Sequence, residues 1–204
     1  ERCRRTSTLQ IGPGAISDMH VSLLQEVLQA MPNLTSVSIF QHQISNDIVA
    51  AIVGSVSVQH LKSLDLSSNA VSDAGAECVA GRIASMPALR SLNLSNNFIG
   101  SAGCVALTRA LTAYECTVED VYLSHNPIGD AAGELCAKLL LVREQERLRH
   151  ISIAYCMVGD KGFQQIALAL DSTIASSLEV SDAITSTLPG PEPHMSVSPC
   201  ACLR

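Results

Sequence analysis

The chain has 204 residues and a net charge of −6, and hydrophobic residues make up 47% of it although aromatic residues make up only 3%. This length allows one or two domains. The acidic balance excludes the broad basic surface typical of nucleic-acid binding, and because no run of 18 or more apolar residues occurs, we expect no membrane span. Since Trp is absent, the core must be largely aliphatic, which favours many small, similar packing layers.

Taken in chain order, the predicted elements form a block of strand, turn and helix that is repeated six times. The blocks start near residues 6, 34, 61, 89, 118 and 148, so neighbouring blocks lie 27 to 30 residues apart. In the third block Leu64 and Leu66 alternate with polar residues, and this period of two predicts a short strand with one buried face. The first block matches the pattern least well, because Gly14 stands where the middle blocks have Asn.

A helix is predicted after each strand and turn. The thirteenth position of every block holds a polar side chain, and we expect its oxygen to cap free amides in the first turn of the helix that follows. These residues are Asp18, Asn46, Asp73, Ser101, Asp130 and Asp160. Apolar pairs four residues apart, such as Val79 with Ile83 and Ile166 with Leu170, predict one buried face on each helix.

The repeated motif, L-x-x-L-x-L-x-x-N-x-I, is clearest at residues 61–71 and 89–99. It resembles the leucine-rich repeat, and the block length resembles that of the ribonuclease-inhibitor-like subclass. Within that subclass the middle blocks are similar to the repeats of NOD-like receptors and of Ran GTPase-activating proteins. The resemblance implies an α/β right-handed solenoid, a horseshoe arc with parallel strands on its concave face and helices on its convex face. Such a motif is specific for a fold and hardly for a function.

We expect the leucine-rich repeat domain to span residues 1–175, and residues 176–204 to form a degenerate repeat followed by a disordered tail. Ser181 and Ala183 occupy positions that should be buried, and prolines recur in the run at 189–193. Neither end shows the polar capping unit that solenoids normally need. We therefore expect the chain either to be a fragment of a longer protein or to pack against a partner.

Three asparagines follow their strands at the same position of the middle blocks, namely Asn69, Asn97 and Asn126. We expect them to be structural, because an amide buried at this turn can satisfy backbone groups of adjacent blocks. Cys78, Cys104 and Cys136 fall at helix positions where we expect buried, reduced side chains. This use of cysteine favours a reducing, cytoplasmic compartment.

The sequence predicts no enzyme and no cofactor. Its histidines are scattered, and none stands in a recognisable catalytic context. The Gly-containing turns lack the Lys of a phosphate-binding loop. Since no C-x-x-C pair occurs, we expect no structural zinc site, and His194, Cys200 and Cys202 form only a loose metal-like set.

The outward strand positions remain as the predicted functional surface, because solenoids present this extended face to other proteins. The residues we expect to bind a partner there are Phe40, Asp65, Asn93, Asp120, Tyr122 and His150. Tyr and Phe are residue types that anchor protein interfaces. The leading prediction is a scaffold that binds another protein through its concave face.

Two alternatives follow from the resemblance. The chain could be a GTPase regulator of the Ran GTPase-activating type, although such proteins use a longer arc and an acidic tail that this sequence lacks. It could also be the ligand-sensing region of a larger NOD-like signalling protein. The sequence itself names no partner.

Overall fold

The computed structural model describes residues 7–14, 20–42, 44–55, 59–141 and 148–172. Within these residues six short strands form one parallel sheet in the order of the chain, from β1 to β6. The strands are β1 (Thr8–Ile11), β2 (Ser36–Ile39), β3 (Ser63–Asp65), β4 (Ser91–Asn93), β5 (Asp120–Tyr122) and β6 (His150–Ser152). Each strand therefore neighbours the strand of the preceding block and the strand of the next.

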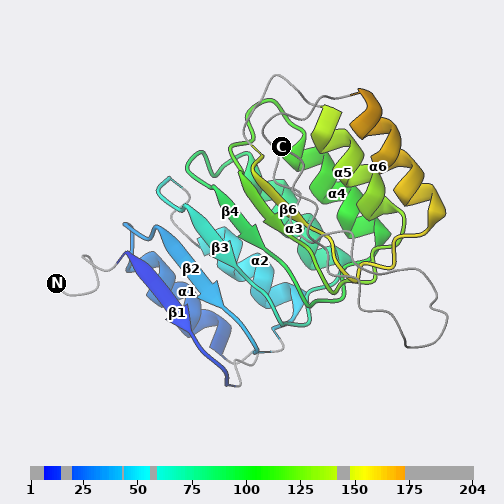
Figure 1. Cartoon of the computed structure of the whole chain (residues 1–204). Coiled ribbons are helices and arrows are strands. Elements are labelled where there is room, and N and C mark those ends of the chain that lie inside the picture. Colours follow the sequence, from blue (N-terminus) through cyan, green and yellow to red (C-terminus); the bar gives the residue numbers. More distant parts are fainter. Residues whose placement is uncertain (1–6, 15–19, 43, 56–58, 142–147, 173–204) are drawn as a thin grey trace, which may run out of the picture.

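Six helices follow the strands in strict alternation and cover one face of the sheet (Figure 1). They are α1 (Val21–Gln29), α2 (Asn46–Ser55), α3 (Asp73–Ile83), α4 (Ser101–Leu111), α5 (Ala131–Leu141) and α6 (Asp160–Ser172). The other face of the sheet carries no helix in the described part of the chain (Figure 1). The predicted α/β solenoid, with its strands in one layer and its helices in the other, is confirmed.

The register of the sheet pairs equivalent positions of consecutive copies. Leu64 lies opposite Leu92, and Val121 lies opposite Ile151. These central strand residues are almost fully buried against the helix layer. Each copy thus adds one aliphatic layer to a continuous core, and burying such a side chain contributes about 1.5–3 kcal/mol.

Leu170 departs from the predicted pattern. Ile166, its partner on α6, is buried, but Leu170 is 38% exposed. Helix α6 is the last element that the structure describes, so no described helix packs against its outer side. A buried face predicted from spacing needs a neighbouring copy to cover it.

Three of the predicted capping residues, Asn46, Asp73 and Asp130, act between copies, which corrects the prediction that each of them caps its own helix. Asp18 lies outside the described residues. Oδ1 of Asp73 accepts hydrogen bonds from the backbone amides of Gly100 and Gly103, at 2.7 and 2.9 Å, in the next copy. Asn46 and Asp130 make the same pair of contacts one copy onward. The approach is close, because a Cβ on Gly103 would lie 2.7 Å from Oδ1 of Asp73.

No helix in the described part of the chain is both long and apolar enough to cross a membrane.

Candidate functional site

The buried turn after each strand fixes the edge of the exposed sheet face. Oδ1 of Asn97 accepts hydrogen bonds from the amides of Asn69 and Val71 in the preceding copy, and its Nδ2 donates to the carbonyls of Leu66 and Leu94. Asn69 and Asn126 repeat this pattern in their own copies. The three asparagines that we expected to be structural therefore lie in buried turns and join neighbouring copies.

Two side chains replace asparagine at this turn. Nε2 of His42 lies 3.2 Å from the carbonyl oxygen of Ile11 in the preceding copy. The thiol of Cys156 donates to the carbonyl of Leu123 at 3.2 Å. Both therefore keep one link between copies, although neither supplies the full donor and acceptor set of an amide.

The exposed sheet face carries all six residues that we predicted to bind a partner, and we call this set the concave surface. It comprises Phe40, Asp65, Asn93, Asp120, Tyr122 and His150, all half-buried. The rings of Tyr122 and His150 lie on adjacent strands with their centroids 4.8 Å apart and tilted by 38°. The register brings Asp120 opposite His150. The structure thus gathers an aromatic pair and a carboxylate on β5 and β6.

Two members of the concave surface also serve the local backbone. Oδ1 of Asp65 accepts a hydrogen bond from the amide of Ser67 and its Oδ2 accepts one from the hydroxyl of Ser38 on β2. Oδ1 of Asn93 accepts a hydrogen bond from the amide of Ser95. These two side chains are therefore held close to the sheet, and Phe40 lies in the second copy, three strands away from Tyr122.

Tyr122 is held in its neutral form. Burial of its side chain raises the pKa of the phenol above its ordinary value of 10, and the negative charge of Asp120 raises it further. A neutral phenol with an exposed edge can both donate and accept a hydrogen bond. This combination of an apolar ring and a polar tip suits a protein interface.

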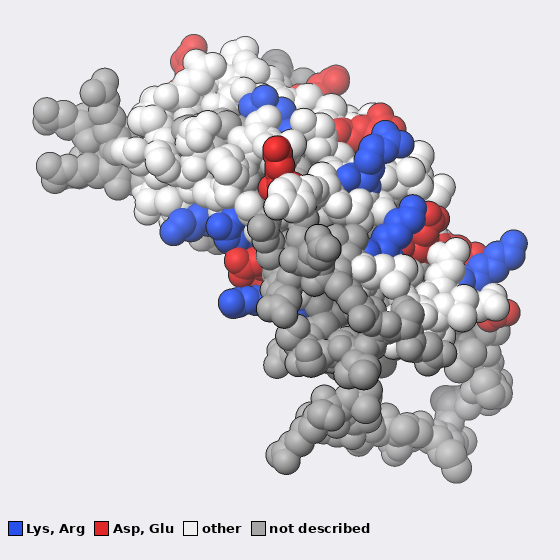
Figure 2. All heavy atoms as spheres, turned by 90° about the horizontal axis from the view of Figure 1, so that it is seen from above, with Lys and Arg blue, Asp and Glu red and all other residues white. Residues whose placement is uncertain are grey.

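Charge at one rim of the sheet is balanced. The carboxylate of Glu119 lies between two guanidinium groups, 3.1 Å from Nε of Arg90 and 3.4 Å from Nε of Arg149. Exposed pairs of this kind contribute little to stability. Figure 2 shows Lys and Arg side chains interspersed with Asp and Glu side chains on the face that it presents.

The turns that follow the strands form a second surface, which the sequence analysis missed. Phe98, Tyr155 and Met157 are exposed large side chains there, and Pro127 and His125 lie with them around a hollow of about 880 Å³. We call these five residues the turn patch. They occupy the eighth and tenth positions of their copies, where the motif specifies no residue type. The sequence could have indicated this patch only through the large side chains that recur at these two positions in successive copies.

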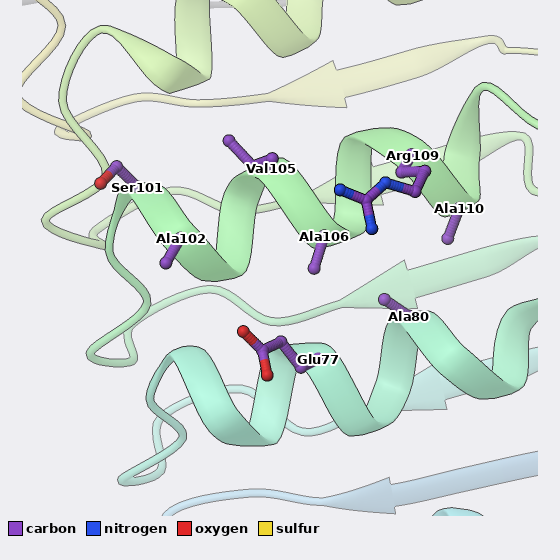
Figure 3. A pocket seen from close by; sticks show the side chains of 8 residues that line it. All are labelled: Glu77, Ala80, Ser101, Ala102, Val105, Ala106, Arg109 and Ala110. Atoms are coloured by element: carbon purple, nitrogen blue, oxygen red, sulfur yellow. The ribbon is translucent and has the colours of Figure 1, made fainter.

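A shallower hollow of about 760 Å³ lies on the helical side between α3 and α4. Figure 3 shows that alanine side chains line much of it, with Glu77 on α3 and Arg109 on α4 at its edges. Its lining offers few groups that could fix the orientation of a ligand. A substitution at Glu77 can therefore serve as a control for binding to the sheet face.

Cys78, Cys104, Cys136 and Cys156 form no disulfide within the part of the chain that the structure describes. Of these, Cys104, Cys136 and Cys156 are buried and Cys78 is half-buried. Burial raises the pKa of Cys104 and of Cys136 from 9.0 to about 12, and that of Cys156 to about 11. These thiols stay protonated at neutral pH and lack the thiolate that redox or nucleophilic chemistry needs.

Comparison with known proteins identifies the repeats. The family model described as Leucine Rich repeat matches residues 59–80, 85–107 and 114–135, which fall in the third to fifth copies. The chain therefore contains leucine-rich repeats. None of the curated proteins matches it.

Solved structures with a similar fold share little sequence with this chain. An actin-binding site 2 domain of leiomodin-1 is 21% identical, with a TM-score of 0.55, and the match covers 78% of this chain and 89% of that one. The tropomodulin C-terminal domain of Caenorhabditis elegans is 19% identical, with a TM-score of 0.57 and coverage of 76% and 92%. An internalin from Listeria monocytogenes is 16% identical, with a TM-score of 0.50 and coverage of 88% and 48%. At these identities the likeness concerns the fold alone.

Proposed function

We propose that this chain is a protein-interaction module that binds a partner protein through the concave surface. The observation that carries the proposal is the aromatic pair of Tyr122 and His150, with centroids 4.8 Å apart on neighbouring strands. Tyr is enriched among the few side chains that contribute most of the binding energy at protein interfaces. The proposal assigns no reaction to the chain, and the buried, protonated thiols favour a reducing, cytoplasmic setting.

The concave surface supports this function by its position. Its residues project from consecutive parallel strands about 4.8 Å apart, on the face of the sheet that no described helix covers (Figure 1). Asp120 adds negative charge beside the aromatic pair and Asp65 adds it two strands away on β3, whereas Lys62, Arg90 and Arg149 hold the second positions of their copies, along one rim. A partner with a basic or mixed surface, contacted over several copies, fits this arrangement.

Actin is the first partner to test. The solved leiomodin-1 domain of similar fold is named as an actin-binding site, and it supplies a definite molecule for a binding measurement. The Ran-type alternative is tested in the same series by adding a GTPase and measuring stimulated GTP hydrolysis. A sensor role in a NOD-like protein is supported if a nucleotide-binding domain precedes these repeats in a longer chain.

The proposal is tested by affinity capture with the immobilised chain, followed by identification of bound proteins, with purified actin measured separately. Tyr122→Ala is the decisive variant. We expect it to weaken binding of the captured partner by about 2 kcal/mol or more, while the melting midpoint stays near that of the unchanged chain because the ring lies outside the core.

Leu168→Ala is the matched control, since Leu168 is 62% exposed on α6, away from the sheet face. A partner that binds the Tyr122 variant as tightly as the unchanged chain would contradict the proposal. Loss of binding in the Leu168 variant would place the interface on the helical side instead.

A further inference from the structure

The turn patch has the chemistry of a binding groove for an apolar chain segment. Phe98 and Met157 are each 66% exposed and Tyr155 is 55% exposed. The rings of His125 and Tyr155 are stacked, with centroids 4.4 Å apart and an angle of 16° between their planes. Such large exposed apolar side chains gathered around one hollow mark an interaction site on a soluble surface.

The backbone holds these side chains outward. His125, Tyr155 and Met157 all have positive φ, at 59°, 57° and 57°. This left-handed conformation is uncommon for residues with large side chains. Amides of the turns are fixed by the neighbouring copy, as in the hydrogen bond from His125 to the carbonyl of Ala154 at 2.8 Å. The patch is therefore preformed and loses little freedom when it binds.

The lack of charged side chains around the hollow favours an uncharged occupant. No Lys, Arg, Asp or Glu side chain is among the described residues that line this hollow, although the chain as a whole has 13 basic and 19 acidic residues. Phosphorylated, acidic or basic segments find no counter-charge there. The side-chain oxygen of Asn96 and the hydroxyl of Tyr155 offer hydrogen bonds to a neutral backbone.

The spacing between successive copies favours one conformation of the bound segment. Phe98 and Met157 hold the same position two copies apart, with Pro127 between them, and two strand spacings amount to roughly 9.6 Å. One turn of a polyproline II helix is three residues and about 9.3 Å long. An extended strand repeats its facing side chains every 6.7 Å or so, which matches neither one nor two spacings.

We propose that the turn patch binds an uncharged, proline-rich segment of a partner protein in the polyproline II conformation. Residues i and i+3 of the segment contact Phe98 and Met157, and the stacked rings of His125 and Tyr155 line the same hollow beside this row. Aromatic-lined grooves take such segments because the ligand is already ordered before it binds. This surface is separate from the concave surface, so the inference does not depend on the function proposed above.

The test is the affinity of the full chain for a fluorescein-labelled decaproline peptide, measured by fluorescence anisotropy. We expect saturable binding, and a rise in Kd of about tenfold or more for Phe98→Ala and for Met157→Ala. Leu168→Ala should leave the Kd unchanged, and a decamer of alternating Gly and Ser should not bind. Circular dichroism establishes that each variant is folded.

The proposal would be overturned by an absence of saturable binding or by a Kd that neither patch variant changes. Tighter binding of an amphipathic helical peptide, or self-association of the chain that Phe98→Ala abolishes, would also overturn it. Tyr122→Ala separates the two surfaces, because it should leave the decaproline Kd unchanged. If that variant and the patch variants weakened decaproline binding equally, the peptide would be occupying the concave surface and the inference would be wrong.

Discussion

Buried side-chain amides link one copy to the next, and Asn97 shows how many backbone hydrogen bonds depend on one such side chain. It accepts hydrogen bonds from two amides of the preceding copy and donates to the carbonyl of Leu66 in that copy and of Leu94 in its own. The leucine of an Asn97→Leu variant has the branched shape of asparagine, but it leaves these buried backbone groups without partners. We expect it to lower the free energy of unfolding by about 1–3 kcal/mol, as measured by urea denaturation.

Asn96 provides the control, because it is the adjacent residue and is exposed. Its φ of 56° suits glycine, so Asn96→Gly removes an exposed amide without straining the turn. The free energy of unfolding of that variant should be close to that of the unchanged chain. If both variants lowered the free energy of unfolding equally, the turn would be sensitive to any substitution. The buried amide of Asn97 would then not be the cause of the loss.

The buried thiols make stability depend on alkaline pH. Cys136 ionises near pH 9.0 when it is unfolded and near 12 when it is folded. Above pH 9 the unfolded state therefore binds fewer protons than the folded state, and stability falls as pH rises towards 12. Between pH 8 and pH 10 we expect Cys136 to account for a loss of about 1 kcal/mol.

The measurement compares the pH dependence of unfolding in the unchanged chain and in Cys136→Ala. The variant is less stable at both pH values, because a side chain has been shortened in the core, but its loss between pH 8 and pH 10 should be smaller. Cys78→Ala is the control, since that thiol is only half-buried. An identical loss in Cys136→Ala would show that the thiol is not shielded in the native state.

Sequence reasoning identified residues whose role the motif dictates and missed those whose role it does not. Leu64, Leu92 and Asn97 recur at fixed positions because every copy needs the same layer and the same turn, so their burial was predictable. Phe98 and Met157 stand at positions that the motif leaves open. Only the structure shows that successive turns bring them to one hollow.

At the scale of the elements, the first turns of α3, α4 and α6 depend on the copy before them. Oδ1 of Asp73 accepts the amides of Gly100 and Gly103. We expect Asp73→Ala to lower the free energy of unfolding by about 1–2 kcal/mol, because two amides at the start of α4 lose their partner. Thermal and urea unfolding both measure the effect.

Asp73→Asn is the matched variant, because Asn46 makes the equivalent contacts with an amide oxygen. It should retain most of the stability that the alanine variant loses. If both variants were equally destabilised, the negative charge would be the important feature, as expected from an interaction with the helix dipole, and the hydrogen bonds would be secondary.

The sequence could not reveal this direction of capping. A polar residue just before a helix has the same signature whether its oxygen reaches the helix that follows or the one in the next copy. The choice depends on how closely the copies stack, which is set by glycines such as Gly103 and Gly162.

At the scale of the whole molecule, the order of the strands was predictable because each copy can bury its apolar face only against its neighbours. The sheet accordingly follows the chain from β1 to β6. The distribution of surface features was less predictable. The six residues of the concave surface do lie on one sheet face, but Asp65 and Asn93 are partly engaged by backbone amides, and their role in binding stays a prediction.

The two faces of the solenoid can be distinguished by their charges. If the partner approaches the sheet with a basic or mixed surface, Asp65 and Asp120 attract it over several ångströms, and replacing both by Lys turns this attraction into repulsion. We expect Asp65→Lys with Asp120→Lys mainly to lower the association rate and to weaken or reverse its dependence on salt, since long-range charge acts on the encounter more than on the final contacts. Stopped-flow measurements at several salt concentrations give both quantities.

The control has to change the net charge equally without touching the sheet. Glu77→Lys with Glu134→Lys does so on the helical side, where Glu77 borders the alanine-lined hollow between α3 and α4 (Figure 3) and Glu134 pairs with Lys138 at 2.6 Å. A partner steered only by net charge would associate at the same rate with both double variants. A partner that docks on the concave surface should be slowed far more by the changes at Asp65 and Asp120, because screening at physiological salt limits each charge to a range of about 8 Å. The opposite ranking would place the interface on the helices, and the function proposed for the sheet face would then be wrong.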